Sequence, residues 1–474
     1  MVLPKLSRLN WLLIFIIAIS AFMRLYRIGD YMEFLGDQGR DVVIVRDFLK
    51  HGNLFFIGPQ TSIGNMYLGP YYYYFIAPSL LLSNFSPIGP AIFIALLSIL
   101  TTYLIYKITV KYFDNKTGYI ASFLFAISPV VIKYSNFSWN PNIMPLFALL
   151  FIYFIDQKKY IYATLAFIMC LNSHYLALLL LFPALFIIIL DRKYITHHWS
   201  SVIGALFTFL LSLAPQLLFD LKHDGQNIKA LTIFFTQRET TVSVLPYKAL
   251  PILPAMFNQV TTRLLAGKVE SVGVIVSIIF SVLIIYSLFK IKNRFLNISL
   301  VWFFSGLVGL ALYKQHIYDH YFGFIYPVIF ILLAITVSRI NKYLAIIIVI
   351  ILSGLSIFSN QFQWEPPKQL VTTQQIDKSI IDKSNGEPFN FALLAKMNYD
   401  PGYLYYLSEN KNYFHLKDLI TDQLFVVCEP FQIDCNPINN PEWGIAAFGW
   451  AKIDSQWEIG DIKIFRLIHN PTGN

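Results

Sequence analysis

Long runs of apolar residues alternate with short polar connections along most of this 474-residue chain. The first run covers Trp11 to Met23, and comparable runs follow one another as far as Asn360. A helix needs about 20 predominantly apolar residues to cross a membrane, and apolar runs of this length and frequency exceed what a soluble core contains. The pattern therefore predicts an α-helical polytopic membrane protein.

Basic residues gather in every second connection between the apolar runs. Because short basic loops stay on the cytoplasmic side of a membrane, they fix the topology of the chain. The interpretation is about eleven transmembrane helices within residues 1–360, in a multi-pass protein of the cell membrane with a cytoplasmic amino terminus. The clusters are Lys5/Arg8, Lys107/Lys111/Lys116, Lys158/Lys159, Arg192/Lys193, Lys290/Lys292/Arg294 and Arg339/Lys342.

Two segments do not fit the simple count of spans. Between Lys159 and Asp191 lie 31 residues with basic pairs at both ends, which predicts two short helices that turn at residues 172–174. Residues 67–82 are apolar enough for a span, but a span here would invert every later loop. We expect instead an in-plane helix on the outer surface, where tyrosine rings are favoured. Arg24, at the end of the first run, is expected to extend to the membrane surface.

The first outer connection, residues 29–87, contains an unusual charged stretch, "FLGDQGRD". The residues that follow it, 41–50, predict a second in-plane helix with an apolar face and a polar face that carries Arg46 and Lys50. Asp37 and Asp41 are four positions apart. If the helix begins at Asp37, both carboxylates project from one side of its amino-terminal end. Asp37 has two possible roles here, as a helix cap or as a functional group.

After Asn360 the composition changes abruptly, and residues 361–474 are expected to form a small extracytoplasmic α/β domain. The runs "FNFALLA", "QLFVVCEP" and "DIKIFRLI" predict strands, and "PGYLYYLSENK" predicts a helix. Cys428 and Cys435 would pair if this domain faces an oxidising space. No catalytic motif is recognisable in it.

The formal net charge of +9 does not indicate a nucleic-acid partner, because the basic residues are not gathered into a stripe with aromatic residues between them. A nucleotide-sugar donor is also disfavoured. The inner loops are short and no glycine-rich phosphate loop occurs.

The predicted topology collects carboxylates, arginines, histidines and tyrosines on the outer face. This combination suits a lipid-linked anionic substrate, because cations hold a phosphate and a carboxylate removes a proton from a hydroxyl. The candidates are Asp37, Arg40, Asp41, Tyr67, Asn140, His174, Arg238, Arg263, His320 and Tyr321.

Four features together resemble the C superfamily of membrane glycosyltransferases, GT-C. They are an aspartate in the first outer loop, an in-plane helix that begins with Gly-Pro and aromatic residues, an "SP" near the end of a later span, and the string "HYFGFIYP" from His320. Within the superfamily, the chain is similar to the branch of protein O-mannosyltransferases and the aminoarabinose transferase of lipid A. The resemblance covers about residues 8 to 345.

The resemblance implies that Asp37 is the catalytic base of a single inverting displacement. Where relatives often carry a second acidic residue beside it, this chain has Gln38, which leaves Asp41 as the nearest second carboxylate. Asn140 stands near the place of a second family aspartate and is expected to bind a sugar hydroxyl.

Relatives with Lys-Pro-Pro before the in-plane helix use that lysine at the donor phosphate, whereas this chain has Leu-Gly-Pro at 68–70. Phosphate binding is therefore expected from Arg40, Arg238 or Arg263. The remaining substrate-binding candidates are Tyr67, His174, His320 and Tyr321.

The implied function is transfer of a sugar, hexosyl or pentosyl, from a polyprenyl-phosphate donor to a hydroxyl of a protein, lipid or glycan. A divalent metal ion between Asp37 and Asp41 is chemically reasonable, but the sequence has no ligand cluster for it, so no metal cofactor is expected. The alternative is a membrane carrier or lipid flippase, which would place ionisable residues near the middle of its spans.

Overall fold

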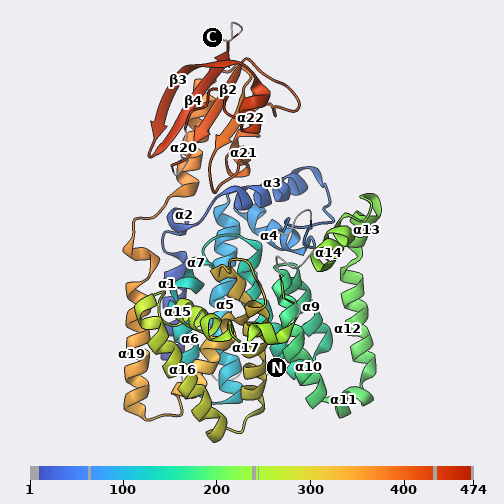
Figure 1. Ribbon diagram of the computed structural model, residues 1–474, viewed down its shortest axis with the longest axis vertical. Helices are drawn as coiled ribbons and strands as arrows, with labels where there is room; N and C mark the ends of the chain where they lie inside the picture. Colours follow the sequence, from blue (N-terminus) through green and yellow to red (C-terminus); the bar gives the residue numbers. More distant parts are fainter. Residues whose placement is uncertain (1–9, 62–65, 237–241, 244, 431–434, 471–474) are drawn as a thin grey trace, which may run out of the picture. The chain divides into compact units, whose positions relative to one another are not determined.

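The computed structural model of the protein describes residues 10–61, 66–236, 242–243, 245–430 and 435–470 (Figure 1). The chain divides into two compact units. The first, here called the helical unit, consists of Met1–Tyr26 and Asn53–Glu365. The second, here called the sheet unit, consists of Arg27–Gly52 and Pro366–Asn474. The sheet unit is therefore discontinuous in sequence.

The described part of the helical unit contains five helical segments that are long and apolar enough to cross a membrane. They are α5 (Ile88–Tyr112), α12 with α13 (Trp199–Ser212 and Ala214–Lys222), α16 (Glu270–Lys290), α17 (Arg294–Ala311), and η5 with α18 (Asp319–Ile325 and Tyr326–Val337). Five shorter apolar segments, of 10 to 17 residues, accompany them. They are α1 (Trp11–Leu25), η1 with α8 (Asn140–Ile143 and Met144–Asp156), α9 (Tyr160–Leu171), η2 with α10 (Tyr175–Leu180 and Leu181–Leu190), and α19 (Lys342–Phe358).

Less apolar or shorter helices complete this unit. They are α4 (Tyr71–Leu82), α6 (Asn115–Ile127), α7 (Pro129–Lys133), α11 (Arg192–His197), α14 (Gln226–Thr236), η4 (Pro246–Ala249), α15 (Leu253–Leu264) and η6 (Gln361–Gln363). The predicted polytopic helical class agrees with this architecture, while the count of about eleven crossings remains a prediction.

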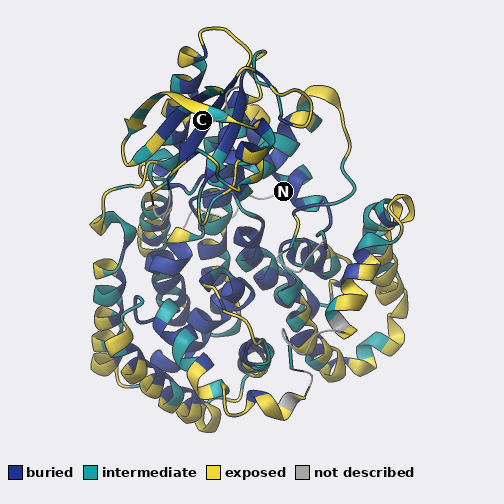
Figure 2. Cartoon of the chain, turned by 45° about the horizontal axis from the view of Figure 1, so that its top comes forward, coloured by how far each residue is buried: buried dark blue, intermediate teal, exposed yellow. Residues whose placement is uncertain are grey.

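The core of the helical unit is built around α18, in which all residues are buried. Helix α16 shows the other extreme, since Ile275, Ile278 and Val282 are more than half exposed. Figure 2 shows this contrast between buried inner helices and outer helices with exposed faces. Apolar side chains exposed along one whole helix face are suited to contact lipid tails rather than water.

Two expectations about short segments had different outcomes. The predicted pair of short helices is confirmed, since α9 ends at Leu171 and η2 begins at Tyr175. Helix α4 has only 12 residues, which is too short for a span. Its rings do not simply form an interfacial belt, however, because Tyr72 and Tyr73 are buried inside the protein.

Arg24 does not extend to the surface as expected. Its side chain is buried, with Nε donating to Ser98 Oγ at 2.8 Å and Nη1 to the carbonyl of Ala126 at 2.8 Å. Helices α5 and α6, which contain Ser98 and Ala126, both pack against α1. They supply acceptors that satisfy the guanidinium inside the protein, so extension to the surface is unnecessary.

The sheet unit contains a four-stranded sheet in the order β1-β2-β4-β3. The strands are β1 (Asn390–Leu394), β2 (Gln423–Cys428), β3 (Ala451–Ile459) and β4 (Ile462–His469). Strand β1 is parallel to β2, and the other two pairings are antiparallel. Helices α20 (Gln369–Lys383), α21 (Pro401–Leu407) and α22 (Trp443–Phe448) accompany the sheet. The strands and helix predicted in this region are confirmed, and β3 was missed.

The segment Arg27–Gly52 packs with this sheet unit, although sequence reasoning grouped it with residues 1–360. It contains α2 (Ile28–Tyr31), which contacts α20, and α3 (Gly36–His51), which contacts α21. The expected helix over 41–50 is thus present and starts five residues earlier, at Gly36.

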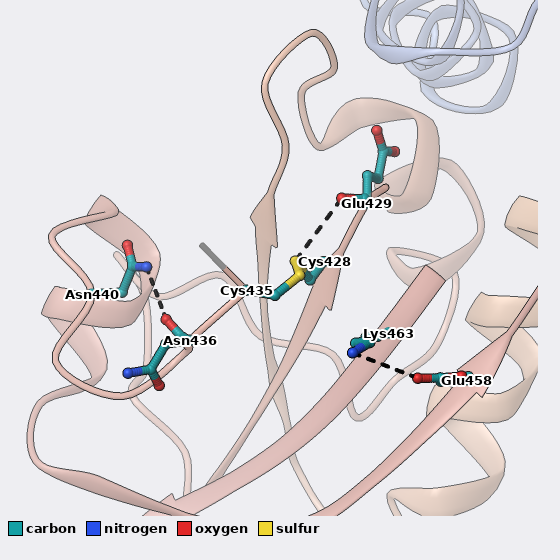
Figure 3. Close-up of a disulfide and its surroundings, with 7 residues drawn as sticks. All are labelled: Cys428, Glu429, Cys435, Asn436, Asn440, Glu458 and Lys463. Atoms are coloured by element: carbon teal, nitrogen blue, oxygen red, sulfur yellow. Dashed lines mark hydrogen bonds and ion pairs between the residues drawn. A yellow bond between two sulfur atoms is a disulfide. The ribbon is translucent and has the colours of Figure 1, made fainter. Parts of the chain in front are cut away.

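Cys428 and Cys435 form a disulfide that closes the connection after β2, with Cα atoms 5.9 Å apart (Figure 3). The third cysteine, Cys170, is a buried free thiol.

Candidate functional site

Within the sheet unit, the candidate residues lie at the start of α3. Leu35, not Asp37, is the residue that caps this helix. The amide of Leu35 donates to Gln38 Oε1 at 2.9 Å, and the amide of Gly36 donates to Asn398 Oδ1 at 2.9 Å. The carboxylate of Asp37 is therefore not used as a cap, and it is available for other contacts.

Asp37 forms an ion pair with Arg40 and a hydrogen bond with Tyr399. Arg40 Nη1 donates to Asp37 Oδ1 at 2.7 Å, and the Tyr399 hydroxyl donates to the same oxygen. Arg40 Nη2 also donates to Asp41 Oδ1 at 2.7 Å. The two carboxylates and one guanidinium give this cluster a net negative charge. Arg40 is thus occupied by carboxylates, which makes the cluster better suited to accept a proton than to bind a phosphate.

The two carboxylates of this cluster differ in exposure. The side chain of Asp41 is 1% exposed, whereas that of Asp37 is 34% exposed. Of the two carboxylates, Asp37 is consequently the more accessible one. Asp41 has a supporting position, because it orients Arg40.

Hydrogen bonds to Glu429 fix the segment that contains Asn398 and Tyr399. Asn398 Nδ2 donates to Glu429 Oε1 at 2.6 Å, and the Tyr403 hydroxyl donates to the same oxygen at 2.9 Å. Burial, together with the charge of Glu429, raises the pKa of Tyr403, so its hydroxyl remains a donor. Residues from the far end of the chain thereby fix the segment that contacts Asp37.

The polar face expected for α3 is packed rather than open. Arg46 is 7% exposed, and its guanidinium lies 4.4 Å from the ring centre of Tyr405. It donates to the carbonyl of Tyr405 and, at 2.9 Å, to Ser408 Oγ. Helix α21 and the turn after it cover this face, and they provide the acceptors that a buried guanidinium requires.

Within the helical unit, four candidates lie together. The rings of His174 and Tyr321 are 4.9 Å apart between centroids, and those of His174 and His320 are 6.3 Å apart. Asn140 Nδ2 donates to the carbonyl of Ser173 at 2.7 Å. Trp139 packs on His320 at 4.5 Å. Sequence reasoning therefore selected residues that are neighbours in space, although it did not select Trp139.

Tyr67 joins this group through its backbone. Its carbonyl accepts a hydrogen bond from Tyr175 at 3.1 Å, and its amide donates to Asn227 Oδ1 at 2.8 Å. Asp220 in turn accepts from the amide of Asn227 at 2.8 Å. Because Tyr175 follows His174 in sequence, the segment before α4 is held beside the histidine cluster.

Arg263 extends the group by a paired charge. Its Nε and Nη2 donate to the two oxygens of Asp319 at 2.7 and 2.9 Å, and Lys268 Nζ lies 3.5 Å from Asp319 Oδ2. Burial lowers the pKa of Lys268, and repulsion from Arg263 and Lys133 lowers it further, while Asp319 acts in the opposite direction. Arg263 and Lys268 therefore surround one buried carboxylate, and the exposed Lys133 lies close enough to Lys268 to add a third positive charge.

Sequence reasoning missed Asp319, Lys133 and Lys268. The position of Asp319 directly before His320 was an available signal. Arg238 lies outside the described residues. In the part of the chain that the structure describes, no three His, Cys, Asp or Glu side chains are grouped as metal ligands would be.

Comparison with known proteins places this geometry in context. Residues 68–219 match the family described as dolichyl-phosphate-mannose-protein mannosyltransferase. The structure is similar to ArnT from Cupriavidus metallidurans bound to undecaprenyl phosphate, with a TM-score of 0.65 over 97% of this chain and 98% of that one, at 10% identity. The chain therefore has an ArnT-like fold.

The apo state of ArnT gives the same result, with a TM-score of 0.63 over 96% of this chain and 97% of ArnT at 10% identity. The apo oligosaccharyltransferase of Archaeoglobus fulgidus has a TM-score of 0.48 and 11% identity, over 84% of this chain and 63% of that one. No curated protein matches the sequence of this chain. The two ArnT structures confirm the resemblance inferred from four short motifs at the level of the fold.

Proposed function

We propose that this chain is an integral membrane glycosyltransferase that moves a sugar from a polyprenyl-phosphate donor to a hydroxyl acceptor on the outer face. The observation that carries the proposal is the Asp37 cluster, in which a partly exposed carboxylate is fixed by two donors at the start of a helix. The match to a mannosyltransferase family and the likeness to an ArnT structure with bound undecaprenyl phosphate support the donor class.

In the proposed reaction Asp37 acts as the general base. Its carboxylate takes the proton of the acceptor hydroxyl as the acceptor oxygen forms a bond to the anomeric carbon of the donor sugar. The bond between that carbon and the phosphate oxygen breaks at the same time, and the polyprenyl phosphate leaves with the electron pair. A single displacement of this kind inverts the anomeric centre and requires only one carboxylate base.

Within the helical unit, Lys133, Arg263 and Lys268 are candidates for binding the phosphate of the donor, because a phosphate is stabilised by positive charge. Asp319 offsets one of these three charges through its contacts with Arg263 and Lys268, and the exposed carboxylate of Glu270, 3.9 Å from Arg263, offsets part of another. Partly buried cations stabilise a developing phosphate charge more strongly than exposed ones do. His174, His320 and Trp139 supply rings for contact with the sugar or the isoprenoid.

The proposed acceptor is a hydroxyl of a protein, a lipid or a glycan. The basic residues in every second connection support a reaction on the outer face. The alternative function, a carrier or flippase, would move a lipid or solute without release of polyprenyl phosphate.

The test uses the purified full chain with a panel of polyprenyl-phosphate sugars and measures release of polyprenyl phosphate. Replacement of a general base lowers turnover by roughly 100- to 10,000-fold, so Asp37→Asn should be nearly inactive. The matched control is Asp47→Asn on the same helix, where the exposed carboxylate lies 2.9 Å from His51 Nδ1. Undiminished release in Asp37→Asn would remove Asp37 from the reaction, and lipid movement without release would favour the carrier.

A further inference from the structure

We propose that Tyr399 is a positioning residue that holds one oxygen of Asp37, so that the other oxygen takes the proton of the acceptor. This inference rests on the proposed role of Asp37 as the base. It gives the carboxy-terminal segment of the sheet unit, Pro366–Asn474, in which the sequence shows no recognisable catalytic motif, a part in positioning the base.

The two oxygens of Asp37 have different surroundings. Oδ1 accepts two hydrogen bonds, one from Arg40 Nη1 at 2.7 Å and one from the hydroxyl of Tyr399. Among the described residues, no group donates a hydrogen bond to Oδ2. With one oxygen fixed by two donors, the carboxylate has one defined rotamer and one oxygen available for the acceptor hydroxyl.

A hydrogen bond from Arg40 alone would restrict the rotamer of the Asp37 carboxylate less. Its guanidinium is shared with Asp41, which takes both Nε at 3.0 Å and Nη2 at 2.7 Å. Only Nη1 reaches Asp37, from a neighbouring turn of the same helix. Tyr399 adds a donor from a separate element, and two donors from different elements restrict the side chain more than one donor does.

Tyr399 is itself held in place from two sides. Its amide donates to Asn398 Oδ1 at 2.9 Å, the same oxygen that accepts the amide of Gly36. A β-carbon at Gly36 would lie 2.6 Å from the Tyr399 ring, so the ring rests directly on the helix backbone. The absence of a side chain at position 36 is therefore what allows the hydroxyl to reach Asp37.

The hydroxyl of Tyr399 keeps its proton in this setting. Burial and the neighbouring carboxylate of Asp37 raise the pKa of Tyr399 above its ordinary value, while Arg40 acts in the opposite direction. Tyr399 thus remains a donor to Asp37 at neutral pH, which is the form that positioning requires.

The test is Tyr399→Phe in the full chain, which keeps the ring and removes the hydroxyl that donates to Asp37 and accepts from Arg40 Nη1 at 3.5 Å. A hydrogen bond to a charged group, once lost, is expected to lower kcat about tenfold or more. KM for the lipid donor should stay within about twofold, because only the base is affected. Tyr406→Phe is the matched control. Its hydroxyl lies in the same unit and accepts from Gln374 at 2.9 Å.

A second readout needs no substrate. Coupling of Asp37 to an amine by a water-soluble carbodiimide, followed by mass spectrometry of the peptide, should be faster in Tyr399→Phe, because Oδ1 loses a covering group. Tyr406→Phe should label at the rate of the unmodified protein. Unchanged labelling, or a kcat within twofold of the unmodified protein, would overturn the positioning role.

The two proposals fail in distinguishable ways. Full activity of Asp37→Asn would refute the base, whatever the behaviour of Tyr399→Phe. An inactive Asp37→Asn together with a fully active Tyr399→Phe would refute the positioning role and leave the base intact.

Discussion

Gly39 of α3 and Gly402 of α21 lie backbone against backbone. A β-carbon built on Gly39 would overlap the amide nitrogen of Gly402 and lie 2.5 Å from the carbonyl carbon of Pro401. Glycine permits so close an approach because it has no side chain. The helix that carries Asp37 is therefore seated directly on the helix that follows Tyr399, and the contact leaves no space for even one methyl group.

Gly39→Ala should lower the stability of the sheet unit by about 1–3 kcal/mol, the usual effect of forcing a methyl group into a filled contact. Turnover should fall as well, because α3 must move away from α21. Thermal unfolding of the full chain, followed by tryptophan fluorescence, and release of polyprenyl phosphate are the measurements. Two alanine controls separate the effect of packing from that of helix propensity.

A β-carbon on Gly402 would lie 3.4 Å from its nearest atoms, and a β-carbon on Gly354 would have no atom within 4 Å. Both substitutions should change the midpoint less than Gly39→Ala, and an equal shift in all three would contradict the packing argument.

Asp377 on α20 should make the stability of the protein fall as pH rises. Its carboxyl is 1% exposed and neither oxygen has a hydrogen-bond partner among the described residues, and burial raises its pKa well above the ordinary value. The unfolded chain releases this proton near pH 4, whereas the folded chain retains it. The contribution of Asp377 to the free energy of unfolding is therefore largest below that pH. It decreases as pH rises toward the raised pKa of the folded form.

The measurement for Asp377 is the thermal midpoint of the full chain between pH 5 and pH 8. The Asp377→Asn variant, which cannot ionise, should show a flatter profile and a higher midpoint at pH 8 than the unmodified protein. Asp382→Asn, one turn further along α20, is the control. Identical pH profiles for Asp377→Asn and the unmodified chain would show that the carboxyl is ionised in the folded state.

The cysteines report the compartment of the sheet unit. With Cys428 paired to Cys435, thiol titration of the denatured, unreduced protein should give one group, from Cys170, and titration after reduction should give three. Disulfides persist in oxidising spaces, so this result would support an extracytoplasmic sheet unit. Closure of a loop this short contributes about 2 kcal/mol, and Cys428→Ser should lower the stability by a similar amount. Three free thiols before reduction would indicate a reducing compartment.

Asp319 should be far more important for stability than Glu270, although both contact Arg263. The side chain of Asp319 is 7% exposed and accepts two hydrogen bonds from Arg263, whereas that of Glu270 is 73% exposed and lies 3.9 Å away. Removal of one partner from a buried pair costs about 3–5 kcal/mol, while an exposed pair contributes about 0–1 kcal/mol. Asp319→Asn should therefore lower the thermal midpoint strongly and Glu270→Gln hardly at all. Equal effects would show that burial does not govern this cluster.

The features that the sequence predicted depend on local patterns. The turn at residues 172–174 follows from the spacing of basic pairs around one apolar run, and strands β1, β2 and β4 follow from apolar runs bounded by polar residues. Strand β3 also has the alternating pattern of a strand, since Ile453, Trp457 and Ile459 are separated by polar residues. It was missed because most of its residues are polar.

The partners of Asp37 and Arg24 could not be predicted in this way. Asp37 and Tyr399 are 362 positions apart, and Arg24 and Ala126 are 102 apart. No periodicity connects such residues, because their proximity results from the packing of elements that the chain forms separately. The polar face of α3 illustrates the same limit. A charged face on a helix has one pattern whether water or Tyr405 covers it.

The hydrogen bond from Gly36 to Asn398 joins positions 362 apart in sequence, and this separation has a consequence for biosynthesis. A ribosome completes the amino-terminal strip of the sheet unit long before it makes the segment that receives it. Premature stop codons upstream of that segment would yield a product that contains the apolar helices yet lacks the residues that pack against α3. Quality control in the cell would thus meet incomplete chains that contain the apolar helices but cannot form the contact between Asp37 and Tyr399.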